Sequence, residues 1–133
     1  MNKIIKKSDL EKKLWQEFSK YVRSVGYCEV HQRAKELNIF LPFRCSKVLQ
    51  ACHKISRSKS AIKYDLRNVF CGCASSNVWA FYNQIEWQEI CKKLWEDDMK
   101  YLEIARKQKY KRSFENLRTL YEFYKAKNIR NKL

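Results

Sequence analysis

Hydrophobic residues repeat with helical spacing near the N-terminus. Over residues 8–26, apolar side chains recur every three or four positions, and charged side chains fill the gaps. Ser8 and Glu11 have the spacing of a capping box, and Gly26 has the backbone freedom that commonly ends a helix. We therefore predict an amphipathic helix over 8–26. Its apolar face comprises Leu10, Leu14, Phe18, Tyr21, Val22 and Val25.

Between residues 27 and 67 the helical spacing is lost. This segment holds short apolar runs, the single proline of the chain and a polar, basic stretch at 54–60. Such a composition favours turns and short strands over helix. We predict a compact, irregular or short-stranded segment between two helical parts.

Helical spacing returns after residue 77. An apolar stripe that includes Trp87 and Leu102 predicts a long helix that begins near Asn83. Ser113 has the position of an N-cap for a last helix, whose apolar face continues to Tyr124. The chain is thus predicted to be a single, mostly helical α+β domain over 1–133. Its predicted parts are the N-terminal helix (8–26), the core (27–92) and a helical C-terminal part with a basic tail (93–133).

The charge balance points to a polyanionic partner. The 133 residues include 29 Lys and Arg against 14 Asp and Glu, a net charge of +15 at pH 7. Nucleic acid is the first such partner to consider, although ribosome or membrane association and the codon bias of an AT-rich genome give a similar excess. No apolar run approaches the roughly 18 residues that span a bilayer, and the N-terminus lacks a signal peptide's apolar stretch. We expect a cytoplasmic protein with no membrane partner.

The central segment concentrates the residues that could carry chemistry. Four short motifs stand out there: Cys28-Glu-Val-His31, Cys52-His53 followed by Ser56-Arg57, Lys63-Tyr-Asp-Leu-Arg-Asn68-Val-Phe, and Gly72-Cys73-Ala-Ser-Ser-Asn77. The chain has six cysteines, and in a reducing compartment clustered Cys and His indicate metal more often than disulfides.

In this order, the motifs resemble those of HNH (ββα-metal) endonucleases, above all the NinG or Rap family of phage recombination nucleases. That family carries two Cys-x-x-Cys pairs, the second followed directly by Asn. Between the pairs lie a Gly-His motif and an Asp-x-x-Asn-Val motif. The resemblance extends from about Phe18 to Asn128.

The resemblance implies a ββα-metal core and metal-dependent cleavage of DNA. In this view His53 is the general base, Asn68 braces the hairpin loop, and Asn77 gives an amide oxygen to a catalytic Mg²⁺ or Mn²⁺. Each residue alone also fits a simpler role, namely a surface histidine, a turn asparagine and a helix N-cap. The DNA would be branched or a recombination intermediate such as a Holliday junction, cut in the cytosol of a phage's bacterial host. A homodimer would suit this task, although no residue indicates one.

The resemblance also implies a structural zinc site, which this chain matches in part. A Cys-x-x-His pair opens the site and one cysteine begins its second half, but the neutral hydroxyl of Ser76 stands where a thiolate is expected. If the site has decayed, its cysteines are small buried hydrophobes. The predicted zinc ligands are Cys28, His31, Cys71 and Cys73, with Cys45 and Cys52 as alternatives to Cys71.

The sequence offers fewer ligands for the catalytic metal than for zinc. Many HNH sites have a carboxylate directly before the histidine, and here Cys52 holds that position. Asp65 is a spare carboxylate in the same region, although a turn or surface role with an ion pair to Lys63 or Arg67 explains it better.

Four cations near His53 are predicted to hold the phosphates of DNA: Arg57, Lys59, Lys63 and Arg67. Two rival functions remain open at this point. One is a nucleic-acid-binding protein on the same scaffold without catalysis. The other is a thiol redox protein that uses the Cys71-Gly-Cys73 segment.

Overall fold

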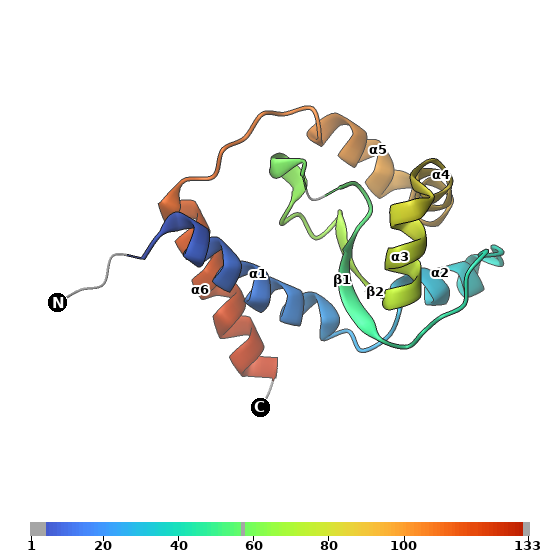
Figure 1. The fold of residues 1–133 in the computed structure, drawn as a ribbon, viewed down its shortest axis with the longest axis horizontal. Coiled ribbons are helices and arrows are strands. Elements are labelled where there is room, and N and C mark those ends of the chain that lie inside the picture. Colours follow the sequence, from blue (N-terminus) through green and yellow to red (C-terminus); the bar gives the residue numbers. More distant parts are fainter. Residues whose placement is uncertain (1–4, 57, 132–133) are drawn as a thin grey trace.

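A two-stranded hairpin followed directly by a helix occupies the middle of the chain. The structure, a computed structural model, describes residues 5–56 and 58–131 (Figure 1). Within these residues it is α+β and mostly helical, as predicted, with six α-helices, one short 3-10 helix and one sheet. The elements are α1 (Lys7–Arg23), α2 (Glu29–Leu37), β1 (Leu49–His53), η1 (Ser60–Ile62), β2 (Val69–Cys73), α3 (Ala74–Tyr82), α4 (Gln84–Leu94), α5 (Glu96–Ala105) and α6 (Phe114–Asn131).

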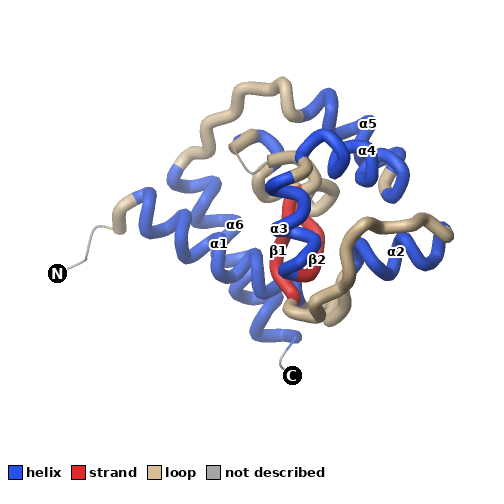
Figure 2. Tube along the Cα trace, turned by 45° about the vertical axis from the view of Figure 1, so that its right-hand side comes forward, coloured by secondary structure: helices blue, strands red, loops and turns tan. Residues whose placement is uncertain are grey.

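The hairpin separates two groups of helices. β1 and β2 pair in antiparallel register, from Leu49 opposite Cys73 to His53 opposite Val69. The pair of helices α1 and α6 lies on one side of the hairpin, and α3 crosses the other side, with α4 and α5 beyond it (Figures 1 and 2). Because strand side chains alternate, each face of the hairpin supplies apolar groups to a different core.

The core on the α1 side is largely aromatic. Phe18 of α1 makes edge contacts with the rings of Tyr64 and Tyr124, at centroid distances of 5.4 and 4.9 Å. Ala51 and Cys71 supply small side chains from the hairpin. This core explains the helical spacing of the N-terminal segment, since Leu10, Leu14, Phe18 and Val22 are all buried in it.

The core on the α3 side joins α2 and the three helices that follow the hairpin. Phe70 of β2 packs against Trp87 and Trp95, with ring centroids 5.9 and 4.9 Å apart. Cys52 and Cys91 are buried in the same core. Gly72 lies here because a Cβ atom at this position would come within 2.9 Å of the Cys52 Sγ and the Phe70 ring.

The helix boundaries in the structure differ in several places from those predicted from the sequence. Ser113 is the N-cap of α6, as predicted, since its hydroxyl accepts a hydrogen bond from the Asn116 N–H at 3.1 Å. The capping box predicted at Ser8 is wrong, because α1 begins at Lys7 and no side chain caps it. The long helix predicted from near Asn83 is two helices, broken where Trp95 leaves the helical conformation.

Helix α2 lies where no helix was predicted. It has nine residues, of which Val30 and Ala34 are buried, too few to give a periodic pattern. It ends at Asn38, which adopts the left-handed conformation typical of helix C-termini. Over the described ranges 5–56 and 58–131, no helix is both long and apolar enough to cross a membrane.

One buried side chain holds the long loop between the strands. Asn68, at the end of this loop, is 0% exposed. Its Oδ1 accepts a hydrogen bond from the Ile55 N–H at 2.8 Å, and its Nδ2 donates to the carbonyls of Ile55 and Ile62 at 2.9 and 3.2 Å. Asn68 therefore braces the loop, the role that the family resemblance implied for it.

We expect Asn68→Ala to destabilise the protein by several kcal/mol. The substitution leaves buried backbone groups of Ile55 and Ile62 without their partner, at about 1–3 kcal/mol for each group. Urea denaturation measures this loss. The exposed Asn77 makes one hydrogen bond, so Asn77→Ala is the matched control and should cost less than about 1 kcal/mol. Equal stability of the two variants would contradict the bracing role.

Candidate metal centre and hairpin site

Four potential metal ligands meet at the base of the hairpin. They are Cys28, His31, Cys45 and Cys73, and their ligand atoms all lie within 4.8 Å of one another. The Cys28 Sγ is 3.2 Å from the Nδ1 atom of His31, and the Cys73 Sγ is 3.9 Å from the same atom. Three thiols and one imidazole at this separation match the donor set of tetrahedral zinc sites. The cluster can therefore hold a metal ion such as zinc.

Three different segments position these ligands. Cys28 is the N-cap residue of α2, and His31 follows one turn later, so both side chains point to the same side of the helix. Cys45 comes from the connection between α2 and β1, and Cys73 is the last residue of β2. A metal here would tie α2 and the connection to the hairpin.

The histidine ring is oriented by the backbone. The Nε2 atom of His31 lies 3.2 Å from the Phe43 carbonyl oxygen, and a carbonyl can only accept, so Nε2 carries the proton. Nδ1 then carries the lone pair and faces the thiols. Histidine ligands of metals are commonly oriented in this way by a second hydrogen bond.

The thiols differ in their electrostatics. Burial raises the pKa of the Cys73 thiol, but hydrogen bonds from Ser76, Ser75 and the Ser46 backbone outweigh it and leave the pKa well below its usual value. Burial and the neighbouring thiols of Cys73 and Cys45 raise the pKa of Cys28. The geometry thus stabilises one thiolate, and a bound cation would stabilise the others.

The structure does not place Cys71 in this cluster. Its thiol lies in the core on the α1 side, and its backbone N–H donates to the Glu29 carboxylate at 2.6 Å. Cys45, predicted only as an alternative ligand, takes the place in the cluster that was expected for Cys71. Ser76 is not a candidate ligand, because its hydroxyl donates to the Cys73 carbonyl at 2.8 Å. The sequence offered no x-x spacing that would single out Cys45.

His53 lies at the end of β1, on the face covered by α1. Its ring stacks on Trp15, with centroids 5.3 Å apart and planes inclined by 15°. Its Nε2 atom lies 3.1 Å from the Lys63 carbonyl oxygen, and since a carbonyl can only accept, Nε2 carries a proton. The ring is thus held by an aromatic neighbour and by the loop that Asn68 braces.

Asn77 lies on the other side of the hairpin. It is exposed on α3, and its Nδ2 donates to the Gln50 Oε1 at 3.0 Å. Gln50 is paired with Gly72, where a Cβ atom would come within 3.1 Å of the Ser76 hydroxyl of α3. Gln50 and His53 are three residues apart on one strand and therefore point to opposite faces. The structure does not bring the side chains of His53 and Asn77 together.

The cations expected to bind DNA also lie next to different helices. Lys59 is exposed, and Lys63 forms an ion pair of 2.9 Å with Glu11 of α1. The Arg67 guanidinium lies over the Tyr101 ring, 3.2 Å from its centroid, on the α5 side. Arg57 lies outside the described residues.

The donors near His53 do not fit a tightly bound Mg²⁺ or Mn²⁺. Cys52 is buried, and burial raises the pKa of its thiol to about 12, so it stays neutral at pH 7. Asp65 is occupied, because it accepts hydrogen bonds from the Arg67 backbone and the Tyr101 hydroxyl, both at 2.8 Å. Among residues 5–56 and 58–131, the Cys/His cluster is the one group of His, Cys, Asp and Glu close enough to hold a metal. Mg²⁺ sites normally use at least one carboxylate.

Comparison of the chain with protein-family models, curated proteins and solved structures gave no match. The case for any function of this protein therefore rests on its own residues and their geometry.

Proposed function

We propose that this protein is a small DNA endonuclease of the HNH (ββα-metal) type with a structural zinc ion. The observation that carries the proposal is the setting of His53: a histidine at the end of the first strand, whose Nε2–H is donated to a loop carbonyl 3.1 Å away. The strand order, with α3 directly after β2 and a metal-capable cluster at their junction, supports it. The net charge of +15 suits a polyanionic substrate.

Zinc has a structural role in this proposal. Cys28, Cys45 and Cys73 would bind as thiolates, together with the Nδ1 atom of His31. Since the ligands come from three segments, metal binding would add directly to the free energy of folding. An ion held by these four residues would lie at the base of the hairpin and would take no part in the reaction.

His53 supplies the chemistry. Its Nδ1 would accept a proton from water as the water oxygen bonds to phosphorus and the bond from phosphorus to the 3′ oxygen breaks; the released oxygen takes a proton from solvent. The Lys63 carbonyl would stabilise the resulting imidazolium through the Nε2–H bond, while Trp15 keeps the ring in its plane. Asn68 acts on the reaction only by fixing the loop that carries Lys63.

The substrate class follows from the resemblance. Branched or recombining DNA, in the cytosol of the bacterial host of a phage or prophage, is the substrate that the NinG-like motifs favour. Asn77 keeps its place in the proposal as a neutral oxygen donor on the α3 side, although no group of three or more potential His, Cys, Asp or Glu ligands includes that side among the described residues.

A second candidate is a nucleic-acid-binding protein that retains the scaffold without cleavage. Two specific observations favour it: the neutral, buried Cys52 thiol in place of a carboxylate, and the opposite faces of His53 and Asn77. The charge and the zinc site are common to both candidates, so activity decides between them.

We expect the purified protein to contain about one equivalent of zinc. Cys45→Ala removes a ligand and should abolish stoichiometric zinc and lower the melting temperature, because metal binding is coupled to folding. Elemental analysis and thermal denaturation with and without EDTA measure both effects. Cys71→Ala is the matched control, since it removes a buried thiol outside the cluster and should retain zinc. Loss of zinc in Cys71→Ala but not in Cys45→Ala would overturn this ligand set.

We expect cleavage of DNA by the wild-type protein with Mg²⁺ or Mn²⁺ added, and a loss of about 10²- to 10⁴-fold in His53→Ala. The readout is single-turnover cleavage of labelled duplex, nicked, flapped and four-way substrates. Lys93→Gln, a change of one exposed residue on α4, is purified in parallel as a control for contaminating nucleases. Undiminished cleavage by His53→Ala would exclude the proposed base. Binding without cleavage by the wild type on all four substrates would favour the second candidate.

A further inference from the structure

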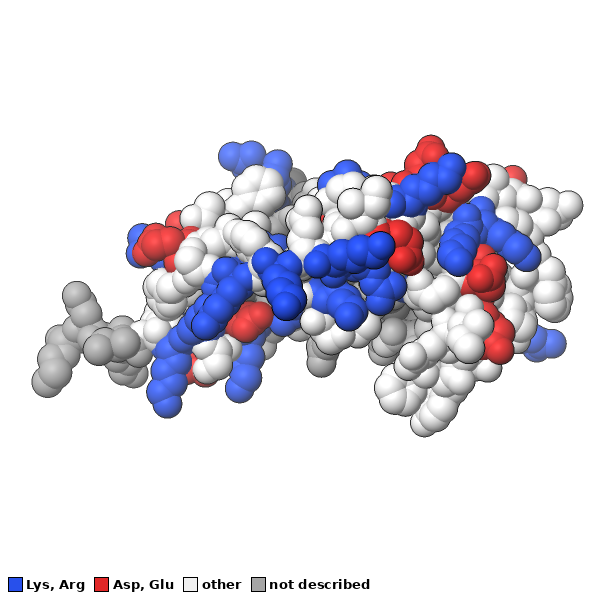
Figure 3. Space-filling model, turned by 90° about the horizontal axis from the view of Figure 1, so that it is seen from above, with Lys and Arg blue, Asp and Glu red and all other residues white. Residues whose placement is uncertain are grey.

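The connection between α5 and α6 concentrates positive charge. Five of the seven residues from 106 to 112 are cations, and the segment crosses the top of the molecule in Figure 1. Seen from above, Lys and Arg side chains gather across the middle of this face (Figure 3). The candidate site described so far makes no use of this connection. Its cations are Arg106, Lys107, Lys109, Lys111 and Arg112.

The connection is fixed against the loop that contains η1. The Ser60 hydroxyl donates to the Tyr110 carbonyl at 2.6 Å. The Arg112 guanidinium lies 5.4 Å from the Tyr64 ring centroid and 5.2 Å from that of Tyr110, and its Nη1 donates to the Asn116 Oδ1 at 2.9 Å. The positive side chains of the connection therefore project from a backbone that is held against the η1 loop.

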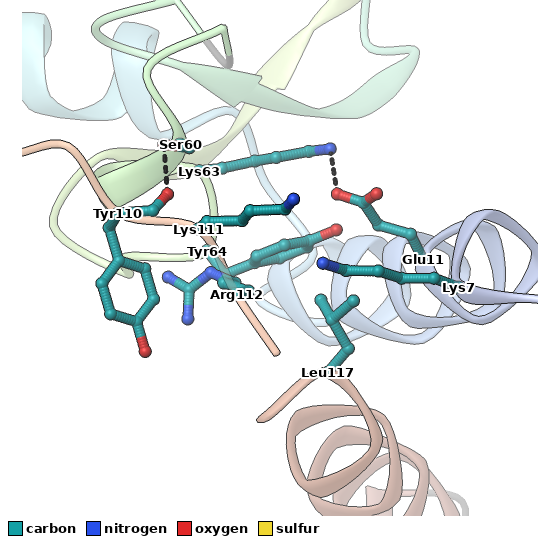
Figure 4. Close-up of a pocket in the computed structure, with 9 residues that line it drawn as sticks. All are labelled: Lys7, Glu11, Ser60, Lys63, Tyr64, Tyr110, Lys111, Arg112 and Leu117. Carbon is teal, nitrogen blue, oxygen red and sulfur yellow. Dashed lines mark hydrogen bonds and ion pairs between the residues drawn. The ribbon is translucent and has the colours of Figure 1, made fainter. Parts of the chain in front are cut away.

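Two adjacent hollows lie along this connection. The first, of about 640 Å³, lies between residues 58–60 and 106–111. The second, of about 380 Å³, lies between the connection, α1 and the η1 loop (Figure 4). Ser60, Tyr110 and Lys111 line both, so the two hollows are adjacent. We call the two hollows together the connector groove.

Nearly all the charged side chains that line the connector groove are positive. Eight lysines and arginines and a single carboxylate, that of Glu11, line the two hollows. Glu11 is already paired with Lys63 at 2.9 Å. In Figure 4 the ammonium groups of Lys7 and Lys111 point toward the middle of the second hollow, beside Tyr64. These are the features of a site for several negative charges in a row.

We propose that the connector groove holds the phosphodiester backbone of a single nucleic-acid strand. The direction of the strand rests on the proposed function: Lys63 lines the second hollow and its carbonyl accepts the His53 hydrogen bond, so this end of the groove shares a residue with the candidate catalytic site. A groove of cations with an exposed aromatic residue, here Tyr110, is the usual form of a site for single strands.

The test is the binding of a fluorescein-labelled 20-nucleotide single-stranded DNA, followed by anisotropy over a range of KCl concentrations without added Mg²⁺. The protein carries His53→Ala, so that cleavage does not interfere. Lys107→Gln, Lys109→Gln and Lys111→Gln are combined in one variant. The matched control combines Lys35→Gln, Lys92→Gln and Lys93→Gln, which removes the same charge from exposed positions on α2 and α4.

We expect the connector variant to bind about tenfold or more weakly and to lose about two units of the salt slope, because each phosphate contact on a single strand contributes roughly 0.7. The control should change affinity by less than about threefold. Equal losses in the two variants would show a diffuse field and overturn the proposal, as would unchanged binding by the connector variant. All six positions are exposed, and melting temperatures check that both variants fold.

This result is independent of the cleavage assay. Loss of binding in the connector variant, with no cleavage by the wild-type protein, would support the groove and reject the nuclease. Cleavage that depends on His53, with binding unaffected by the connector variant, would support the nuclease and reject the groove.

Discussion

The buried amide of Asn68 is the interaction on which the centre of this protein depends. The loop between β1 and β2 is long, and its polar backbone passes between two cores. Asn68 satisfies groups at both Ile55 and Ile62 from a position where water does not reach. Because the loop is closed in this way, the Lys63 carbonyl is held within hydrogen-bond distance of His53. Loss of the brace would release both cores and the histidine together.

The residue after His53 shows a related constraint. Lys54 is only 3% exposed, and burial lowers the pKa of its ammonium group, an effect that Asp98 opposes. The ammonium donates to the Arg67 carbonyl at 2.7 Å, pairs with Asp98 at 3.2 Å and lies over the Trp95 ring. The buried ammonium group can keep its charge because it contacts a carboxylate, a carbonyl oxygen and the face of an aromatic ring. It links the end of β1 to α5 across the core.

The sequence predicted those elements whose buried residues are numerous enough to form a pattern. α1 buries four residues at helical spacing, and α6 has a Ser113 cap, so both were found. α2 buries two residues and was missed. In the same way, the short spacing of Cys28 and His31 in the sequence indicates a pair of metal ligands. Cys45 has no such spacing, and it reaches the cluster only because the connection between α2 and β1 folds back toward the hairpin. Ligands that are close in the sequence can therefore be predicted from it, but a ligand that a long connection brings into the cluster cannot.

The placement of His53 and Asn77 follows from strand parity. β1 is regular as far as His53, so Gln50 and Cys52 share one face while Ala51 and His53 share the other. Asn77 is bound to the first of these faces through Gln50. A substrate that reached both residues would therefore have to pass around the end of the strand, next to the loop of residues 54–68. The charge of the connector groove lies along that same loop, on the His53 side, where Lys63 lines the groove. A phosphate backbone drawn into this groove would lie on the Lys63 side of that loop, the side of His53, and away from Asn77.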